Sequence, residues 1–274
     1  MTQRDEAKKL ENMTDNVNSE MFSRNIGLIS ESEQDILKNS TVAIAGVGAD
    51  GGLLAERLVR IGIGNLRLAD PDTFDVSNLN RQFGCDDETI GRNKAEVVAE
   101  IAKKINTTVN IKTYPGVNAE NIEEFISGTD VVVDEIDYTR LDISVMLHRE
   151  ARHLGKHVFL GVNIGWGANI FVFAPDGMTL EEYVGLPNES SDEEIRNFVI
   201  PPEKFAPQVP EYMDADLVDK IIHGQIPIPA VSPSVALEAA MLSTVIITYL
   251  TKSEISNIIP RYSSIDLLSK RAIL

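Results

Sequence analysis

The sequence predicts a single α/β domain built around a mostly parallel β-sheet. Short apolar segments of strand type alternate with amphipathic helical segments through the first two thirds of the chain, a pattern typical of successive β-α-β units. A glycine-rich turn follows the first strand and opens a helix. With 274 residues, of which 43% are hydrophobic and 24% charged, the chain is long enough to bury a sizeable core.

The elements follow in a regular order. We expect residues 1–18 to be a polar, flexible tail and residues 19–274 to form the domain. A helix is predicted over 31–38, because Ser30 and Glu33 have the spacing of a capping box. Further strands are predicted at 42–45, 66–69, 109–113, 130–134, 157–161, 168–173 and 259–265, and further helices at 52–61, 92–105, 119–127, 140–154 and 234–250. The last helix contains Glu238, so we interpret it as a buried helix rather than a membrane span.

Residues 175–233 differ in composition from the rest. Nine of the 12 prolines lie there, together with an acidic run at 189–194. We therefore expect a long irregular excursion without regular structure, and we hypothesise that it faces the substrate.

The glycine turn has the spacing G-x-G-x-x-G, formed by Gly46, Gly48 and Gly51. Glycines permit a sharp turn and close approach of the backbone to a phosphate, and the following helix N-terminus offers free N–H groups to the anion. Asp70 ends the second predicted strand, where an acid can accept hydrogen bonds from ribose hydroxyls. These features predict a nucleotide site in a Rossmann-like fold.

Polar and basic residues after this strand suggest which nucleotide is bound. Asn78, Arg81, Gln82 and Lys94 supply donors and positive charge suited to a triphosphate, which a nicotinamide cofactor lacks. Asp72 either caps the loop or contacts the ligand, and the sequence leaves both roles open.

Charge and cysteine content exclude some classes of function. The net charge of −17 argues against an extended nucleic-acid or anionic-membrane surface. The single cysteine, Cys85, cannot form an intrachain disulfide, and we expect a cytoplasmic protein.

The segment from Ser40 to Asn106 resembles the ThiF/MoeB/HesA family of ubiquitin-activating-like adenylyltransferases, and the resemblance extends over about 22–250. The family pattern D-x-D-x-V-x-x-S-N-L-x-R-Q corresponds to DPDTFDVSNLNRQ at 70–82, I-G-x-x-K to IGRNK at 90–94, and D-V-V-x-D-x-x-D to 130–137. The resemblance implies a three-layer Rossmann-like adenylation domain that uses ATP and magnesium. Asp70 would bind the ribose, and the phosphates would be bound by Asn78, Arg81, Gln82 and Lys94.

The resemblance also implies roles for residues outside the phosphate group. Asp137 would bind magnesium, and Arg24 would reach across a homodimer to the partner's nucleotide. Independently of the family, Asp134 at a strand end either assists in binding the metal or is structural. The implied reaction joins a carboxylate to AMP and releases pyrophosphate. The carboxylate would be the C-terminus of a ubiquitin-like protein or peptide.

The chain departs from the family pattern at several positions. Many members bind structural zinc through two CxxC pairs, so with one cysteine we expect no zinc. No cysteine follows Asp137, so we expect no thioester step, and Cys85 is expected to be an ordinary thiol. Asp50 adds a negative charge to the glycine turn, and Tyr138 replaces the usual Asn after Asp137; both put full activity in doubt.

Three functions therefore remain open. The first is carboxylate adenylation, with ATP-dependent modification of a tRNA nucleoside as a variant that the net charge disfavours. The second is a non-catalytic scaffold or heterodimer subunit. The third is an NAD-dependent oxidoreductase, which would leave Lys94 and its neighbours without a purpose.

Overall fold

The computed structural model describes residues 20–187, 190–207, 209–222, 225–255 and 257–274, so the expected tail at 1–18 lies outside the described residues. An eight-stranded sheet has the order β3-β2-β1-β4-β5-β6-β7-β8. The strands are β1 (Thr41–Ala45), β2 (Asn65–Ala69), β3 (Asn110–Tyr114), β4 (Val131–Asp134), β5 (Val158–Ile164), β6 (Gly167–Phe173), β7 (Ser263–Asp266) and β8 (Arg271–Ile273). β1 to β5 pair in parallel, and β6 to β8 extend the sheet antiparallel.

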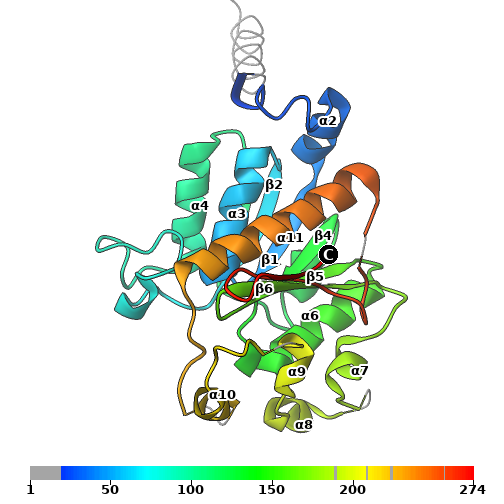
Figure 1. The fold of residues 1–274 in the computed structure, drawn as a ribbon. Coiled ribbons are helices and arrows are strands. Elements are labelled where there is room, and N and C mark those ends of the chain that lie inside the picture. The colour runs from blue at the N-terminus through cyan, green and yellow to red at the C-terminus, as the bar shows by residue number, and fades with distance from the viewer. Residues whose placement is uncertain (1–19, 188–189, 208, 223–224, 256) are drawn as a thin grey trace, which may run out of the picture.

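Helices cover both faces of this sheet (Figure 1). The longer helices are α2 (Glu31–Asn39), α3 (Ala49–Ile61), α4 (Lys94–Ile105), α6 (Leu141–His153) and α11 (Ser232–Lys252). The shorter ones are α5 (Ile122–Ile126), α7 (Leu180–Val184), α8 (Asp192–Asn197), α9 (Pro202–Phe205) and α10 (Ala215–Ile222), with single 3₁₀ turns η1 (Val76–Asn78) and η2 (Tyr138–Arg140).

Two apolar cores lie between the sheet and the helices, one on each face of the sheet. Alternate residues of each strand point to opposite faces, so Val42 and Ile44 pack with α3, α4 and α11, whereas Ala43 and Ala45 pack with α5, α6 and α7. Glycines allow the connections to come close: an added Cβ on Gly64 would collide with the backbone of Lys38. The predicted α/β class, with three layers and a mostly parallel sheet, is confirmed.

The predicted elements up to residue 173 are all present, with ends shifted by a few residues. The capping box of α2 is also present, since Glu33 N donates to Ser30 Oγ at 3.3 Å and Ser30 N donates to Glu33 Oε2 at 2.8 Å. The predicted strand at 259–265 begins only at Ser263, and β8 was not predicted.

The prediction that residues 175–233 lack regular structure is wrong. Four short helices, α7 to α10, lie there, below the sheet in the view of Figure 1. Thr179 and Ser191 begin α7 and α8 with capping boxes, and Pro202 occupies the first turn of α9, where its missing N–H costs no hydrogen bond. The segment packs tightly: Tyr183 of α7 and Phe205 of α9 both contact Phe171 of β6.

Helix α11 is long and apolar enough to cross a membrane by length and composition alone. In the fold it lies across the sheet and packs against α3, β5 and β6 (Figure 1). Leu242 and Ile246 are fully buried in this contact. This packing agrees with the expected buried helix.

Candidate functional site

The glycine turn lies where the strand order of the sheet reverses. β1 is flanked by β2 and β4, and parallel α/β sheets bind ligands at the carboxyl ends of strands at such a point. Gly46 has a φ of +90°, and an added Cβ would collide with the carbonyl of Glu135 at the end of β4. Gly48 is the N-cap of α3 and provides no side-chain hydrogen bond to the helix. The first turn of α3 thus presents backbone N–H groups, which suit an anion.

Asp70 fixes the shape of this turn. It is 4% exposed, and its carboxylate accepts hydrogen bonds from Val47 N at 2.8 Å and Asp72 N at 2.9 Å. Burial raises the pKa of Asp70, an effect opposed by these bonds and by the Lys94 charge. The predicted bond to a ribose is not tested by this arrangement, which gives Asp70 a second role in holding the turn against β2.

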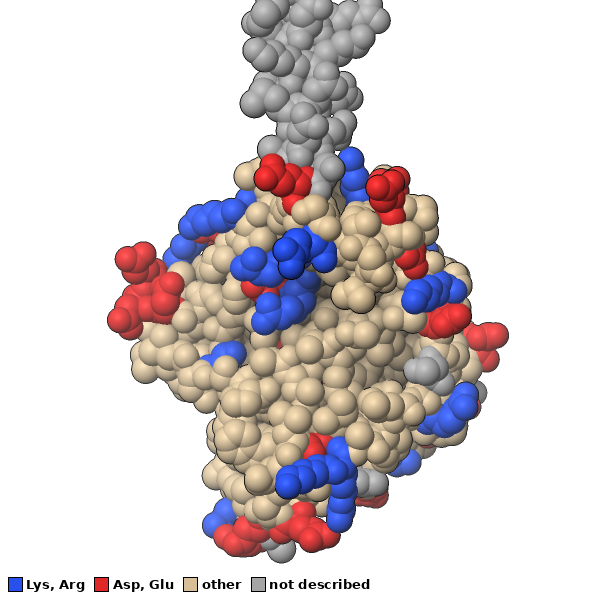
Figure 2. All heavy atoms as spheres, turned by 45° about the horizontal axis from the view of Figure 1, so that its top comes forward, with Lys and Arg blue, Asp and Glu red and all other residues tan. Residues whose placement is uncertain are grey.

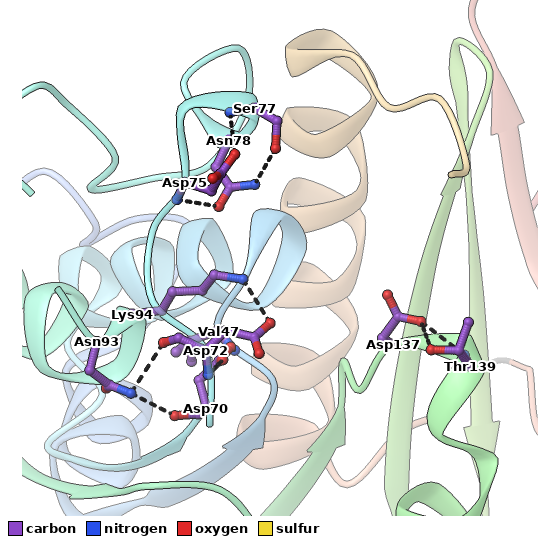
Figure 3. Close-up of polar contacts among 10 residues, drawn as sticks. All are labelled: Val47, Asp70, Asp72, Asp75, Ser77, Asn78, Asn93, Lys94, Asp137 and Thr139. Atoms are coloured by element: carbon purple, nitrogen blue, oxygen red, sulfur yellow. Dashed lines mark hydrogen bonds and ion pairs between the residues drawn. The ribbon is translucent and has the colours of Figure 1, made fainter. Parts of the chain in front are cut away.

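Lys94 begins α4 and is directed toward the same turn. It is 8% exposed, and its Nζ lies 3.1 Å from Asp72 Oδ2 (Figure 3). Asn93, which was not predicted as a site residue, caps α4 and donates to the carbonyls of Asp70 at 2.9 Å and Asp72 at 3.2 Å. An Asn directly before an amphipathic run is a recognisable N-cap signal. The ion pair with Lys94 is a further contact of Asp72, and it does not decide between the two roles left open, capping the loop and contacting the ligand.

Asn78, Arg81 and Gln82 lie on the loop that follows. Asn78 is 8% exposed and its Oδ1 accepts from Asp75 N at 3.1 Å. Arg81 Nη1 donates to Ser77 O at 3.0 Å, while its Nε is buried and has no partner in the described part of the chain. The Gln82 amide lies against Gly48, near 3.7 Å from the position of an added Cβ, and its Oε1 also lacks a partner. These unpartnered polar atoms beside the turn are ready to bind a polar ligand.

Asp137 and Arg24 lie apart from this group. Asp137 is the N-cap of η2, and its Oδ1 accepts from Thr139 N at 2.9 Å and Thr139 Oγ1 at 2.6 Å (Figure 3). Its exposed carboxylate leaves room for an external ligand. Arg24 is exposed in the turn before α2.

Asp134, at the end of β4, contacts α6. It is fully buried and accepts from Ser144 Oγ at 3.3 Å, with His148 Nε2 at 3.1 Å, both on α6. Asp134 Oδ1 also accepts from Ile136 N at 3.1 Å. These contacts hold the segment between β4 and η2 and leave Asp134 a structural role.

Three further polar residues border the turn. Glu135 follows β4, Asn163 lies near the end of β5, and Glu238 is in α11. Asn163 Nδ2 donates to Asp50 in the first turn of α3, and Gly161 N donates to Glu135 Oε1 at 3.1 Å. The one sequence signal among them was Glu238, an acid within an otherwise apolar helix.

The ThiF family model matches residues 22–273. Among curated proteins, the chain is 36% identical over 129 residues to tRNA threonylcarbamoyladenosine dehydratase of Bacillus subtilis, covering 46% of this chain and 50% of the relative. It is 32% identical over 141 residues to molybdopterin-synthase adenylyltransferase of Haemophilus influenzae, covering 51% of this chain and 57% of the relative. The chain thus spans about half the length of these relatives.

Solved structures share the fold at low sequence identity. MccB of E. coli, crystallised with ATP, superposes with a TM-score of 0.65 at 18% identity, covering 88% of this chain and 64% of MccB. PaaA superposes with a TM-score of 0.63 at 20% identity, covering 88% of this chain and 65% of PaaA.

Proposed function

The chain belongs to the ThiF family, and we propose that it adenylates a carboxylate with ATP and magnesium. The observation that carries this proposal is the largely buried Lys94 side chain, whose ammonium pairs with Asp72, two residues after the Asp70 that holds the glycine turn. An NAD-dependent oxidoreductase has no comparable need for a buried cation at this position, because its cofactor carries only a pyrophosphate.

The reaction is limited by repulsion rather than by proton transfer. A peptide carboxylate has a pKa near 3.5 and is ionised at neutral pH, so no general base is needed. Bringing it to about 4 Å from a phosphate charge costs roughly 4 kcal/mol at an effective dielectric of 20. Lys94 and Arg81 would offset this repulsion, and the α3 N-terminus would bind the phosphates.

Magnesium fits the proposed site at Asp137. The ion prefers oxygen ligands and usually binds through one or two carboxylates, several waters and phosphate oxygens. Asp137 provides an exposed carboxylate near the carboxyl end of β4. When bound there, magnesium would neutralise charge on the triphosphate.

We further propose a homodimer in which Arg24 reaches the partner's nucleotide. The exposure of Arg24 and of the neighbouring Ile26 and Leu28 supports this, because Leu28 is 92% exposed and a dimer would cover it. Zinc and a thioester step have no part in the proposed reaction, since the chain has a single cysteine, Cys85. Burial raises the pKa of Cys85 and disfavours its thiolate.

We propose that the segment at 175–233 selects the substrate. Its last residues approach the phosphate loop, because Asn80 Nδ2 donates to Ala230 O at 3.1 Å. Tyr212 joins it to the β5–β6 turn: Trp166 N donates to Tyr212 Oη at 2.7 Å, and Tyr212 Oη donates to Asp266 Oδ2 at 2.7 Å. Deleting the whole segment would expose Phe171 of β6, which is fully buried against Tyr183 and Phe205 of the segment, so point variants are the better probe.

We propose a ubiquitin-like protein or peptide as the source of the carboxylate. The tRNA alternative has support from the dehydratase relatives, but a polyanion needs a basic surface. On the face drawn in Figure 2, Lys and Arg gather near the top but also occur on the right side and at the bottom, interspersed with Asp and Glu, and the middle of this face is uncharged. With a net charge of −17, this pattern favours a protein or peptide.

The direct test is magnesium-dependent exchange of labelled pyrophosphate into ATP. The acceptors are a C-terminal peptide with a free carboxylate, the same peptide amidated, and unmodified tRNA. Exchange only with the free carboxylate is expected. ATP binding without exchange for any acceptor would favour the non-catalytic scaffold, and failure to bind ATP would refute the proposal.

A further inference from the structure

Three carboxyl groups from distant parts of the chain meet behind the glycine turn. Asp50 comes from the first turn of α3, Glu135 from the end of β4 and Glu238 from α11. Glu238 Oε1 and Glu135 Oε1 both lie within 2.9 Å of the point where a Cβ on Gly161 would stand. Asp50 is connected to the same group through Asn163, which donates to it from β5.

The group contains more acceptor oxygens than donors. Glu238 is fully buried, and neither of its carboxylate oxygens has a hydrogen-bond partner among the residues that the structure describes. Asp50 Oδ1 and Asn163 Oδ1 are buried without a partner as well. Buried polar atoms are rarely left in this state in native proteins, so several oxygens pointing into one region indicate a missing positive or hydrogen-bond-donating group.

The chain itself offers little to balance these charges. Burial raises the pKa of Glu238 well above the usual range and that of Asp50 to about 7. Arg81 is the cation that opposes the rise at Asp50, but its Nη1 is hydrogen-bonded to Ser77 O and Asn80 Oδ1. By contrast Glu56, another buried acid of α3, is paired with both Arg57 and Arg60.

We propose that Asp50, Glu135 and Glu238, with the amide oxygen of Asn163, bind a small inorganic cation beneath the glycine turn. Carboxylate and amide oxygens are the donors that hard cations prefer. Within the described residues, no group of three or more acidic, His or Cys side chains is arranged to coordinate a metal ion directly. The occupant is therefore a hydrated divalent ion, which keeps several waters between itself and the protein, or a larger monovalent ion.

This site differs from the one proposed at Asp137, whose carboxylate is exposed and bonded to Thr139. A cation behind the turn would offset the acidic charge next to the triphosphate. The effect on the triphosphate rests on the proposed function. Cation binding itself does not, and it is tested in the absence of nucleotide.

The experiment measures cation binding to the full chain in nucleotide-free buffer. Free Mn²⁺ is followed by electron paramagnetic resonance, and thermal unfolding is compared in K⁺, Na⁺ and tetramethylammonium chloride at equal ionic strength. The variants are Glu238→Gln and Asp50→Asn, which remove a charge while keeping shape. Glu56→Gln is the matched control, and Asp137→Asn removes the other carboxylate.

Two results would support the site. For a divalent occupant, Glu238→Gln and Asp50→Asn weaken Mn²⁺ binding at least tenfold, while Glu56→Gln and Asp137→Asn retain one bound ion. For a monovalent occupant, K⁺ or Na⁺ raises the melting temperature of the wild type relative to tetramethylammonium, and Glu238→Gln abolishes that rise. If no cation binds, or if Glu238→Gln binds cations as the wild type does, protons or water satisfy these acids and the proposal is wrong.

Discussion

Replacing Lys94 by methionine should weaken ATP binding about 10- to 100-fold. The side chain is 10% exposed and its ammonium lies 3.1 Å from Asp72, so a bound phosphate would replace this partly solvated carboxylate as the partner of a largely buried cation. A hydrogen bond to a charged group contributes roughly 1.5–3 kcal/mol, and each 1.4 kcal/mol corresponds to about a factor of ten in affinity. Methionine keeps the apolar stem of the lysine and thus separates the charge from the packing.

The loss of the ion pair with Asp72 does not cancel this effect. Asp72 is 67% exposed on its side chain, and pairs with a solvated partner contribute at most about 1 kcal/mol. Lys112→Met is the matched control. Lys112 also pairs with an acid, Glu124, but it lies on β3, away from the site. Its ATP affinity should equal that of the wild type.

The assay is calorimetric titration of ATP with magnesium at two salt concentrations. A change of less than twofold in the dissociation constant of Lys94→Met would refute the reasoning that places the triphosphate at this ammonium. Asp72→Asn gives a second, opposite test. If Asp72 only competes with phosphate for Lys94, the variant binds ATP as tightly as the wild type or more tightly; weaker binding would mean that Asp72 itself contacts the nucleotide.

The remaining predictions address other residues of the site. Asp137→Asn should reduce pyrophosphate exchange at least about 100-fold, as chelation of magnesium would, and unchanged exchange would exclude Asp137 as the metal ligand. Asp70→Ala leaves the backbone N–H groups of Val47 and Asp72 without an acceptor and should lower the free energy of unfolding by about 1–3 kcal/mol in urea titrations. A smaller loss would show that the turn does not depend on this carboxylate. Burial raises the pKa of Asp50 to about 7, above its unfolded value, so the folded chain holds the extra proton and stability falls as pH rises between about 4 and 7. In EDTA with tetramethylammonium as the only monovalent cation, Asp50→Asn should flatten this fall by up to about 1.4 kcal/mol per pH unit, and parallel stability curves for the two proteins would contradict it. Tyr212→Phe removes the hydroxyl between the β5–β6 turn and β7 and should alter the KM for the peptide more than the affinity for ATP; equal effects on both would argue against a substrate-facing role.

Local patterns in the sequence were sufficient to predict the parallel part of the sheet. Strand and helix periods depend on neighbours two to four residues apart, and the glycine turn and the Ser30 capping box are short signals of known geometry. The α7 to α10 helices were missed because their 4 to 8 residues are too short to show a helical period. Their capping boxes at Thr179 and Ser191 were readable, and the prolines were interpreted as breaks although Pro202 starts a helix.

Pairings between distant residues could not be predicted in the same way. The contact of Lys94 with Asp72 spans 22 positions, and the approach of Glu238 to Glu135 depends on where α11 crosses the sheet. The local sequence around an acidic residue does not indicate which other acidic residue it will contact in the fold. The resemblance to a family assigned roles to the residues of the shared motif. It assigned no role to the residues at which this chain departs from that motif.

Asp50 illustrates why such a departure is a poor argument against activity on its own. From the sequence alone, Asp50 adds a negative charge to a turn that is expected to bind phosphates, and this charge would repel them. In the fold its carboxylate is hydrogen-bonded to Asn163 and belongs to a group that also includes Glu135 and Glu238. A lone Asp50 would reduce ATP affinity, whereas an Asp50 neutralised by a proton or a bound cation would not. The effect of this residue on catalysis therefore depends on the charge state of a site assembled from three separate elements of the chain, and activity should follow cation supply if that site governs it.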